Sequence, residues 1–111
     1  MKNLRRDLPS LSSLLPFEAA ARLGSITKAG EELGLTQAAV SKQIGALEQD
    51  LGTALFERRN RAVFLTDEGR RFAAVLSEAL QSIAGASRDL RDRDKAGEVL
   101  LRSQLCEGLY W

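Results

Sequence analysis

The sequence contains no histidine, a single cysteine and few aromatic residues. Histidine is the most common general base and the most common protein ligand of zinc, so its absence removes Ser-His and Cys-His nucleophile pairs and most zinc sites. The lone Cys106 excludes an internal disulfide and a thiol pair. We therefore do not expect an enzyme, and we expect no metal or other cofactor.

Long apolar runs are also missing. No segment approaches the roughly 20 apolar residues that cross a bilayer, and no apolar stretch typical of a signal peptide follows the first residues. We therefore expect a cytoplasmic protein with no membrane partner. The formal net charge of the 111 residues is only +1, so nucleic-acid binding would depend on where the charges lie rather than on their sum.

The apolar residues that are present recur at three- and four-residue steps, which is typical of amphipathic helices. A first helix is predicted within residues 12–23. Ser13 is its expected cap, because Pro16 then falls in the first turn, where a missing N–H costs little. Residues 1–10 are predicted to be a basic, flexible arm. The fold is thus expected to begin near residue 11.

Two further helices are predicted, joined by a short turn. Ser25 can cap a helix over residues 26–33, and Gly34 can end it. Thr36 can cap a third helix that ends at Leu51, with one apolar stripe and an opposite polar face. Two helices joined by a glycine-containing turn, the second with a polar outer face, are typical of a helix-turn-helix motif.

The pattern changes after this motif. Two short apolar runs at residues 54–58 and 62–65 flank a polar turn, which predicts a β-hairpin. Thr66 can cap a long last helix over residues 67–94, whose apolar residues alternate at steps of four and three. This row predicts a dimerisation surface and consists of Phe72, Leu76, Ala79, Ile83, Ala86 and Leu90. For Phe72 and Leu76, packing against their own domain is the alternative.

The predicted fold class is therefore mainly α. A winged helix-turn-helix over residues 11–66, with a three-helix core and a hairpin wing, is followed by a long dimerisation helix. The last residues, 95–111, have no clean period and are predicted to be a tail.

Candidate DNA-contacting residues lie on the polar face near the start of the third helix. A helix fits the major groove, where side chains at its N-terminal end reach base edges. Those side chains belong to Gln37, Ala38, Ser41 and Lys42. They offer an amide for adenine, a methyl group for thymine, a hydroxyl, and an ammonium for guanine or phosphate. The alternative is that they form only the hydrated face of an amphipathic helix.

Three arginines, Arg58, Arg59 and Arg61, cluster around the predicted hairpin turn. Like charges repel unless an anion lies nearby, so the cluster favours a phosphate backbone or a minor groove, with a solvated loop as the alternative. The helix starts supply further candidate phosphate contacts, although capping alone also explains the first of them. These candidates are Ser25, Thr27 and Thr66.

Several motifs together resemble the N-terminal domain of LysR-type transcriptional regulators. They are Phe17-Glu18-Ala19-Ala20, Ser25-Ile26-Thr27-Lys28-Ala29, Thr36-Gln37-Ala38-Ala39-Val40-Ser41-Lys42-Gln43-Ile44, Leu47-Glu48, Leu51-Gly52, Leu55-Phe56-Glu57-Arg58 and Leu65-Thr66-Asp67-Glu68-Gly69. The resemblance covers about residues 9–95. It implies double-stranded DNA as partner and dimerisation through the last helix. It also implies base and phosphate contacts by Gln37, Ala38, Ser41 and Lys42, and wing contacts by Arg58 and Arg61.

Three departures from the family pattern stand out. Gly45 replaces a usually basic residue of the third helix, and Gly30 replaces a usual alanine, each at a cost of about 1 kcal/mol in helix propensity. We therefore expect weaker DNA binding than is typical. Family members also continue into an effector-binding domain, whereas here Val99-Leu100-Leu101 resembles a remnant of its first strand. No small-molecule effector is expected for this chain.

The leading functional hypothesis is sequence-specific binding of double-stranded DNA by a homodimer that regulates transcription. The alternative is a dimerisation module that pairs with a full-length regulator and inhibits it.

Overall fold

The computed structural model describes residues 3–59 and 62–95. Its elements are α1 (Leu4–Asp7), α2 (Leu11–Leu23), α3 (Ile26–Leu33), α4 (Gln37–Leu51), β1 (Phe56–Arg59), β2 (Ala62–Leu65) and α5 (Asp67–Lys95). The chain forms two compact units, residues 1–77 and 78–111, and the division falls within α5. The predicted mainly α fold with one hairpin is confirmed. The predicted tail lies outside the described residues apart from the last residue of α5.

Side-chain caps fix the starts of α3 and α4, as predicted. Ser25 Oγ accepts a hydrogen bond from the Lys28 N–H at 3.1 Å, and Thr36 Oγ1 accepts one from the Ala39 N–H at 3.0 Å. Between them Gly34 takes a φ of 71°, a left-handed conformation that glycine adopts without strain. These local signals turn the chain from α3 into α4 within three residues.

Gly30 has a structural reason beyond its helix propensity. The Leu35 N–H donates to the Gly30 carbonyl oxygen at 2.8 Å, which closes the turn after α3. A Cβ on Gly30 would lie 2.6 Å from the Leu35 carbonyl oxygen, closer than real Cβ atoms approach. Gly30 therefore permits the close turn after α3, in addition to lowering the helix propensity of α3.

The start of α2 differs from the prediction. The helix begins at Leu11 after Ser10, and the hydroxyl of the buried Ser13 donates to the Ser10 carbonyl oxygen at 2.9 Å instead of capping the helix. Pro16 therefore lies inside the helix, where its missing N–H removes one helical hydrogen bond. Its side chain is fully buried, so core packing offsets the lost bond. Cap rules applied to sequence do not include that packing.

The segment before α2, predicted to be a flexible arm, contains the single helical turn α1. Asn3 Oδ1 accepts a hydrogen bond from the Arg6 N–H at 3.2 Å and caps this turn. The spacing of Asn3 and Arg6 is a local signal for a helix start, but the prediction considered only the basic composition of this segment. Every residue of α1 is exposed.

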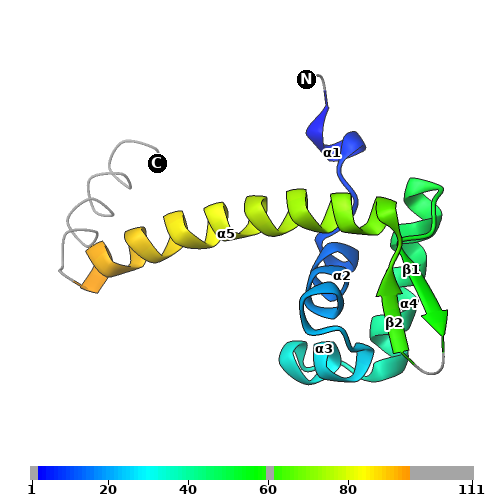
Figure 1. Ribbon diagram of the computed structural model, residues 1–111. Helices are drawn as coiled ribbons and strands as arrows, with labels where there is room; N and C mark the ends of the chain where they lie inside the picture. Colours follow the sequence, from blue (N-terminus) through cyan, green and yellow to red (C-terminus); the bar gives the residue numbers. More distant parts are fainter. Residues whose placement is uncertain (1–2, 60–61, 96–111) are drawn as a thin grey trace. The chain divides into compact units, whose positions relative to one another are not determined.

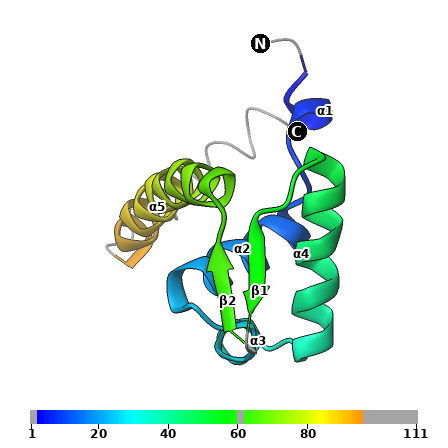
Figure 2. The same ribbon diagram turned by 45° about the vertical axis from the view of Figure 1, so that its right-hand side comes forward.

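The core of the first unit lies between the three helices α2, α3 and α4 and the hairpin (Figures 1 and 2). Phe17 of α2 is fully buried, and its ring centroid lies 5.4 Å from that of Phe56 and 5.7 Å from that of Phe72. Burying one such side chain contributes about 1.5–3 kcal/mol. The apolar stripe of α4 supplies Val40, Ile44 and Leu47 to this core. Leu51, the predicted end of the stripe, is 38% exposed.

The hairpin pairs β1 with β2 in antiparallel register, with Phe56 opposite Leu65 and Arg58 opposite Val63. Because side chains alternate along a strand, these four residues share one face of the hairpin, and Glu57, Arg59 and Phe64 share the other. The first face includes Phe56, which is buried in the core. Arg58 is thus directed to the same side of the hairpin as the body of the unit.

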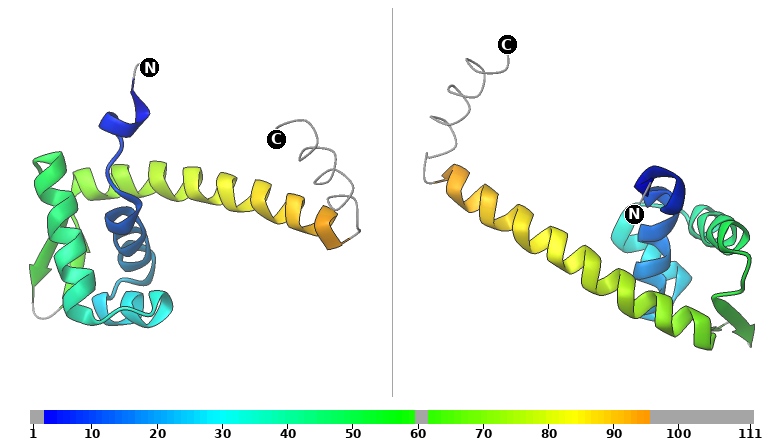
Figure 3. Two further views of the ribbon diagram at one scale, coloured as in Figure 1. Left: turned by 180° about the vertical axis from the view of Figure 1, so that it is seen from behind. Right: turned by 90° about the horizontal axis from the view of Figure 1, so that it is seen from above.

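The last helix, α5, runs without interruption from Asp67 to Lys95 (Figure 3). At the start of the apolar row, the structure shows the alternative given for Phe72 and Leu76, packing against their own domain. Leu76 is buried in its own unit, and Phe72 is half-buried against Phe17. Periodicity gives the same heptad positions to core and partner contacts, so only the place of a residue along the helix distinguishes the two in the sequence. The rest of the row is exposed and consists of Ala79, Ile83, Ala86 and Leu90.

Candidate nucleic-acid interface

The predicted DNA-contacting elements gather at one end of the unit formed by residues 1–77. In Figures 1 and 2, α3, the N-terminal end of α4 and the strand ends next to the hairpin turn all lie along the lower edge. The helix-turn-helix and the wing therefore face the same side.

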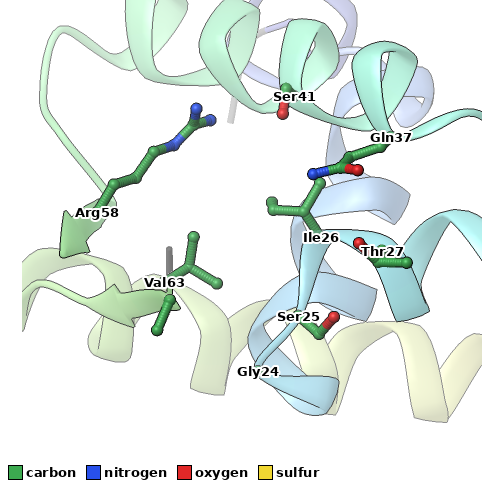
Figure 4. Close-up of a pocket in the computed structure, with 9 residues that line it drawn as sticks. Gly24, Ser25, Ile26, Thr27, Gln37, Ser41, Arg58 and Val63 are labelled. Carbon is green, nitrogen blue, oxygen red and sulfur yellow. The ribbon is translucent and has the colours of Figure 1, made fainter. Parts of the chain in front are cut away.

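A groove of about 450 Å³ lies between these elements. Its lining residues are Gly24, Ser25, Ile26, Thr27, Gln37, Ser41, Arg58, Ala62 and Val63. Arg58 extends from the wing toward α4, Gln37 and Ser41 come from α4, and Ser25 and Thr27 come from the start of α3 (Figure 4). The groove thus brings together five of the residues that the sequence singled out, from three separate elements.

The outer face of α4 is open. Gln37, Ala38 and Lys42 are exposed, and Ser41 is half-buried at the wall of the groove. Gly45 lies one turn beyond Ser41 and Lys42 and is also exposed. A Cβ placed on Gly45 would have no neighbour within 4 Å. No described part of the chain covers the predicted reading face.

The arginine cluster predicted around the hairpin turn is divided by the structure. Arg58 lines the groove, whereas Arg59 lies on the other face of the hairpin, with its guanidinium carbon 5.0 Å from the centroid of the Phe64 ring. Such an arrangement is a cation–π contact. Arg61 lies outside the described residues. Of the arginines described on the strands, Arg58 is the one that faces α4.

Thr66 has a structural role at the start of α5. Its Oγ1 accepts a hydrogen bond from the Gly69 N–H at 3.0 Å, which confirms the predicted cap, and donates its proton to the Ala54 carbonyl oxygen at 2.8 Å. A hydroxyl has one proton, so Thr66 has none left to donate to a phosphate. This pairing, which joins residues twelve positions apart, could not be predicted from the sequence.

A fork of ion pairs joins α2 to α3. The Arg22 guanidinium donates to Glu32 Oε1 at 3.1 Å and to Glu18 Oε2 at 3.0 Å. The hydrogen bonds to Glu32 and then to Glu18 raise the pKa of Arg22 above its usual value, and the bond from Arg22 lowers the pKa of the Glu32 carboxyl. The single positive charge of Arg22 offsets part of the negative charge of Glu18 on α2 and of Glu32 on α3.

Two contributors to the site had no assigned role in the sequence. The Glu48 carboxylate accepts hydrogen bonds from the backbone at the root of the wing, and its partners are seven and eight residues away. Val63 forms an apolar part of the groove together with Ile26. Cross-strand alternation in the hairpin could have placed Val63 on the side of Arg58.

Residues 3–59 and 62–95 contain no group of three acidic, histidine or cysteine side chains that could hold a metal ion. Over the same residues, no helix is both long enough and apolar enough to cross a membrane.

A family model described as a bacterial regulatory helix-turn-helix protein of the lysR family matches residues 11–70, which is more than half of the chain. The chain belongs to the LysR family. The match begins where α2 begins and extends into the first turn of α5. The resemblance inferred from the motifs is therefore confirmed.

This LysR-family chain is 50% identical over 88 residues to the HTH-type transcriptional regulator TrpI of Pseudomonas aeruginosa. The aligned segment covers 79% of this chain and 30% of that regulator. The chain spans about a third of the length of the curated relatives it matches. Two similar crystal structures are complexes with DNA. The CbnR_DBD–DNA complex matches with a TM-score of 0.65 and 35% identity over 79% of this chain and 99% of that one. The BenM_DBD/catB site 1 DNA complex matches with a TM-score of 0.69 and 32% identity, over 76% of this chain and 94% of that one.

Proposed function

We propose that this chain binds double-stranded DNA sequence-specifically as a homodimer and thereby regulates transcription. The observation that carries the proposal is the groove that places Gln37 and Ser41 of α4 opposite Arg58 of the wing. Membership of the LysR family, a relative named as a transcriptional regulator, and similar structures solved with DNA all support it.

The N-terminal half of α4 reads base edges in this proposal. Gln37 pairs its amide with adenine, and Ala38 offers its methyl group to thymine. Ser41 donates or accepts from the wall of the groove, and Lys42 reaches a guanine or a phosphate. The exposure of Gln37, Ala38 and Lys42 on one face of α4, with Ser41 at the wall of the groove, supports these roles.

Contacts to the DNA backbone come from the other two walls of the groove. Arg58, and with it Arg61, contacts phosphate or the minor groove from the wing. Thr27 and the proton of Ser25 contact phosphate at the start of α3, where unpaired N–H groups also favour an anion. Such contacts set the register of the protein on the duplex, while α4 selects the sequence.

The exposed part of the apolar row on α5 forms the dimer contact in this proposal. Ile83 and Leu90 are 63% and 53% exposed, and their heptad spacing on one side of the helix supports a partner that covers them. Ala79 and Ala86 lie between and beside them at heptad spacing. A two-fold dimer reads two half-sites related by a dyad. Chromosomal DNA of a bacterium lies in the cytoplasm, so the proposal places the chain there, without a catalytic reaction.

The test begins by selecting bound duplexes from a random DNA pool and measuring the dissociation constant of the best one. Gln37→Ala and Ser41→Ala should each weaken binding to the selected duplex about 5- to 140-fold, because a base contact contributes about 1–3 kcal/mol of discrimination. Binding to a scrambled duplex should change little. Gln43→Ala, on the side of α4 away from the groove, is the matched control.

Equal affinity for every duplex, unaffected by either substitution, would overturn sequence-specific binding. A chain that dimerises but prefers no duplex would instead support the alternative, in which α5 pairs with a full-length regulator.

A further inference from the structure

The strand that carries Arg58 is tied to α4 at its root by one side chain. Glu48 Oε2 accepts hydrogen bonds from the backbone N–H of Leu55 at 2.8 Å and of Phe56 at 3.1 Å. Both bonds are partly buried, and bonds to an ionised acceptor are stronger than neutral ones. The first residue of β1 is therefore fixed directly to the recognition helix.

Other hydrogen bonds at the root of the wing do not involve α4. The Thr66 N–H donates to the Leu55 carbonyl oxygen at 3.0 Å, and Thr66 Oγ1 donates to the Ala54 carbonyl oxygen. These bonds join the two ends of the hairpin to each other. The bonds to Glu48 instead join the hairpin to α4, and they determine where the wing begins relative to that helix.

Glu48 lies on the same helix as one wall of the groove, and its hydrogen-bond partners lie at the start of the strand that forms the opposite wall. Glu48 lies two helical turns beyond Ser41, and Arg58 lies two residues beyond Phe56 on the same face of β1. Moving the root of β1 would therefore move Arg58 relative to Ser41, the residue on the opposite wall of the groove.

We propose that Glu48 is a positioning residue that holds the wing at the distance from α4 at which Arg58 and α4 contact the same DNA site. The inference rests on the proposed DNA-binding function. Glu48 itself does not contact DNA in this proposal, and its negative charge would repel phosphate if it did.

Two substitutions separate the reach of the side chain from its charge. Glu48→Gln keeps the length and an oxygen that accepts both N–H groups, but removes the charge. Glu48→Asp keeps the charge but is one methylene shorter, so its carboxylate cannot reach both N–H groups from the same backbone position. A positioning role requires reach, whereas a purely electrostatic role requires charge.

The experiment combines each variant with Arg58→Ala and measures dissociation constants for the selected duplex at several salt concentrations. With Glu48 or with Glu48→Gln, Arg58→Ala should weaken binding about tenfold and reduce the salt slope by about one phosphate contact. With Glu48→Asp, Arg58→Ala should cost less than about twofold, because the wing no longer reaches its contact. Such non-additivity is a result that general loss of stability does not produce.

An unchanged tenfold cost of Arg58→Ala in the Glu48→Asp background would overturn the inference. The inference would also be overturned if Arg58→Ala no longer weakened binding in the Glu48→Gln background. This measurement can be made even if Glu48→Asp does not fold. Amide hydrogen exchange of Leu55 and Phe56, measured without DNA, should be at least about tenfold faster in Glu48→Asp than in the native chain or Glu48→Gln. If the native chain shows no sequence preference, the proposed function fails, while the exchange result still tests the tie itself.

Discussion

Gly45 leaves a gap in the middle of the outer face of α4, beside Ser41 and Lys42. Gly45→Arg should raise the free energy of unfolding by about 1 kcal/mol, because arginine has a higher helix propensity than glycine and the position is open. It should also tighten DNA binding and steepen the salt dependence by about one phosphate contact. Denaturant unfolding and salt-dependent binding titrations measure the two effects.

Gly45→Ala is the matched control, since it gains the same helix propensity without a charge. It should stabilise the chain and leave the salt slope unchanged. An arginine that leaves the salt slope unchanged would mean that this part of α4 does not face the DNA backbone.

Unlike Gly45, Gly69 has no room for a side chain, because the first turn of α5 packs closely against the root of the wing. A Cβ on Gly69 would lie 2.1 Å from the carbonyl oxygen of Leu55, a backbone atom that no rotamer change can move. Gly69→Ala should therefore lower the free energy of unfolding by at least about 1–3 kcal/mol, the range for overpacked cores. Chemical denaturation compared with Gly45→Ala checks this. Equal stability of the two alanine variants would show that the contact is looser than described.

At the scale of elements, the exposed row of α5 gives a direct test of the dimer. Ile83→Glu should weaken dimerisation by at least tenfold, about 1.4 kcal/mol, because a charge would be buried in an apolar contact. Analytical ultracentrifugation measures the dissociation constant. Ala84→Glu is the control, because neighbouring residues on a helix do not share a face. Similar effects of both substitutions would contradict the assigned row.

Elements defined by local signals were predictable from sequence. The caps Ser25 and Thr36 each contact an N–H three residues away, so their spacing alone revealed two helix starts. Heptad spacing alone, by contrast, could not fix where burial within the first unit ends along α5, between the buried Leu76 and the exposed Ile83. That distinction depends on which residues Phe17 and the wing bring alongside α5. The contacts of Glu48 escaped prediction for the same reason, because they depend on tertiary structure.

At the scale of the whole molecule, the lack of histidine predicts how binding responds to pH. No side chain of the 111 residues has an ordinary pKa between about 5 and 8, so no proposed contact changes its charge there. The affinity for a selected duplex should stay constant within about twofold from roughly pH 6 to 7 at fixed ionic strength. Fluorescence anisotropy titrations test this, and a steep change in that range would point to a strongly shifted group at the interface.

Stability should respond to pH at values below this range. The bond from Arg22 lowers the pKa of the Glu32 carboxyl in the folded chain, so its contribution is fully present above the unfolded pKa of about 4.3. This contribution is lost as the pH falls through the lower, folded pKa. Thermal unfolding should therefore show a smaller acid-induced loss for Glu32→Gln than for the native chain. Identical acid profiles would mean that the exposed ion pair contributes nothing measurable.

The net charge of +1 gave no indication of a DNA partner, yet the charges are distributed in a way that suits one. Arg58 and Lys42 are exposed on the side of the groove and the outer face of α4, whereas Glu18 and Glu32 are paired with Arg22. The motif spacings were sufficient to predict the fold and the family. Alternation along β1 alone separates Arg58 from Arg59, whereas the face that packs on the core is given by the burial of Phe56, which depends on tertiary structure.

Both ends of the hairpin are anchored, through Glu48 on one strand and through Thr66 and Gly69 after the other. An insertion near either anchor would have to displace α4 or α5. The strand ends away from the turn are therefore the part of the wing whose length is fixed by both neighbouring helices, and a residue added there should disturb the DNA-reading helix as well as the wing.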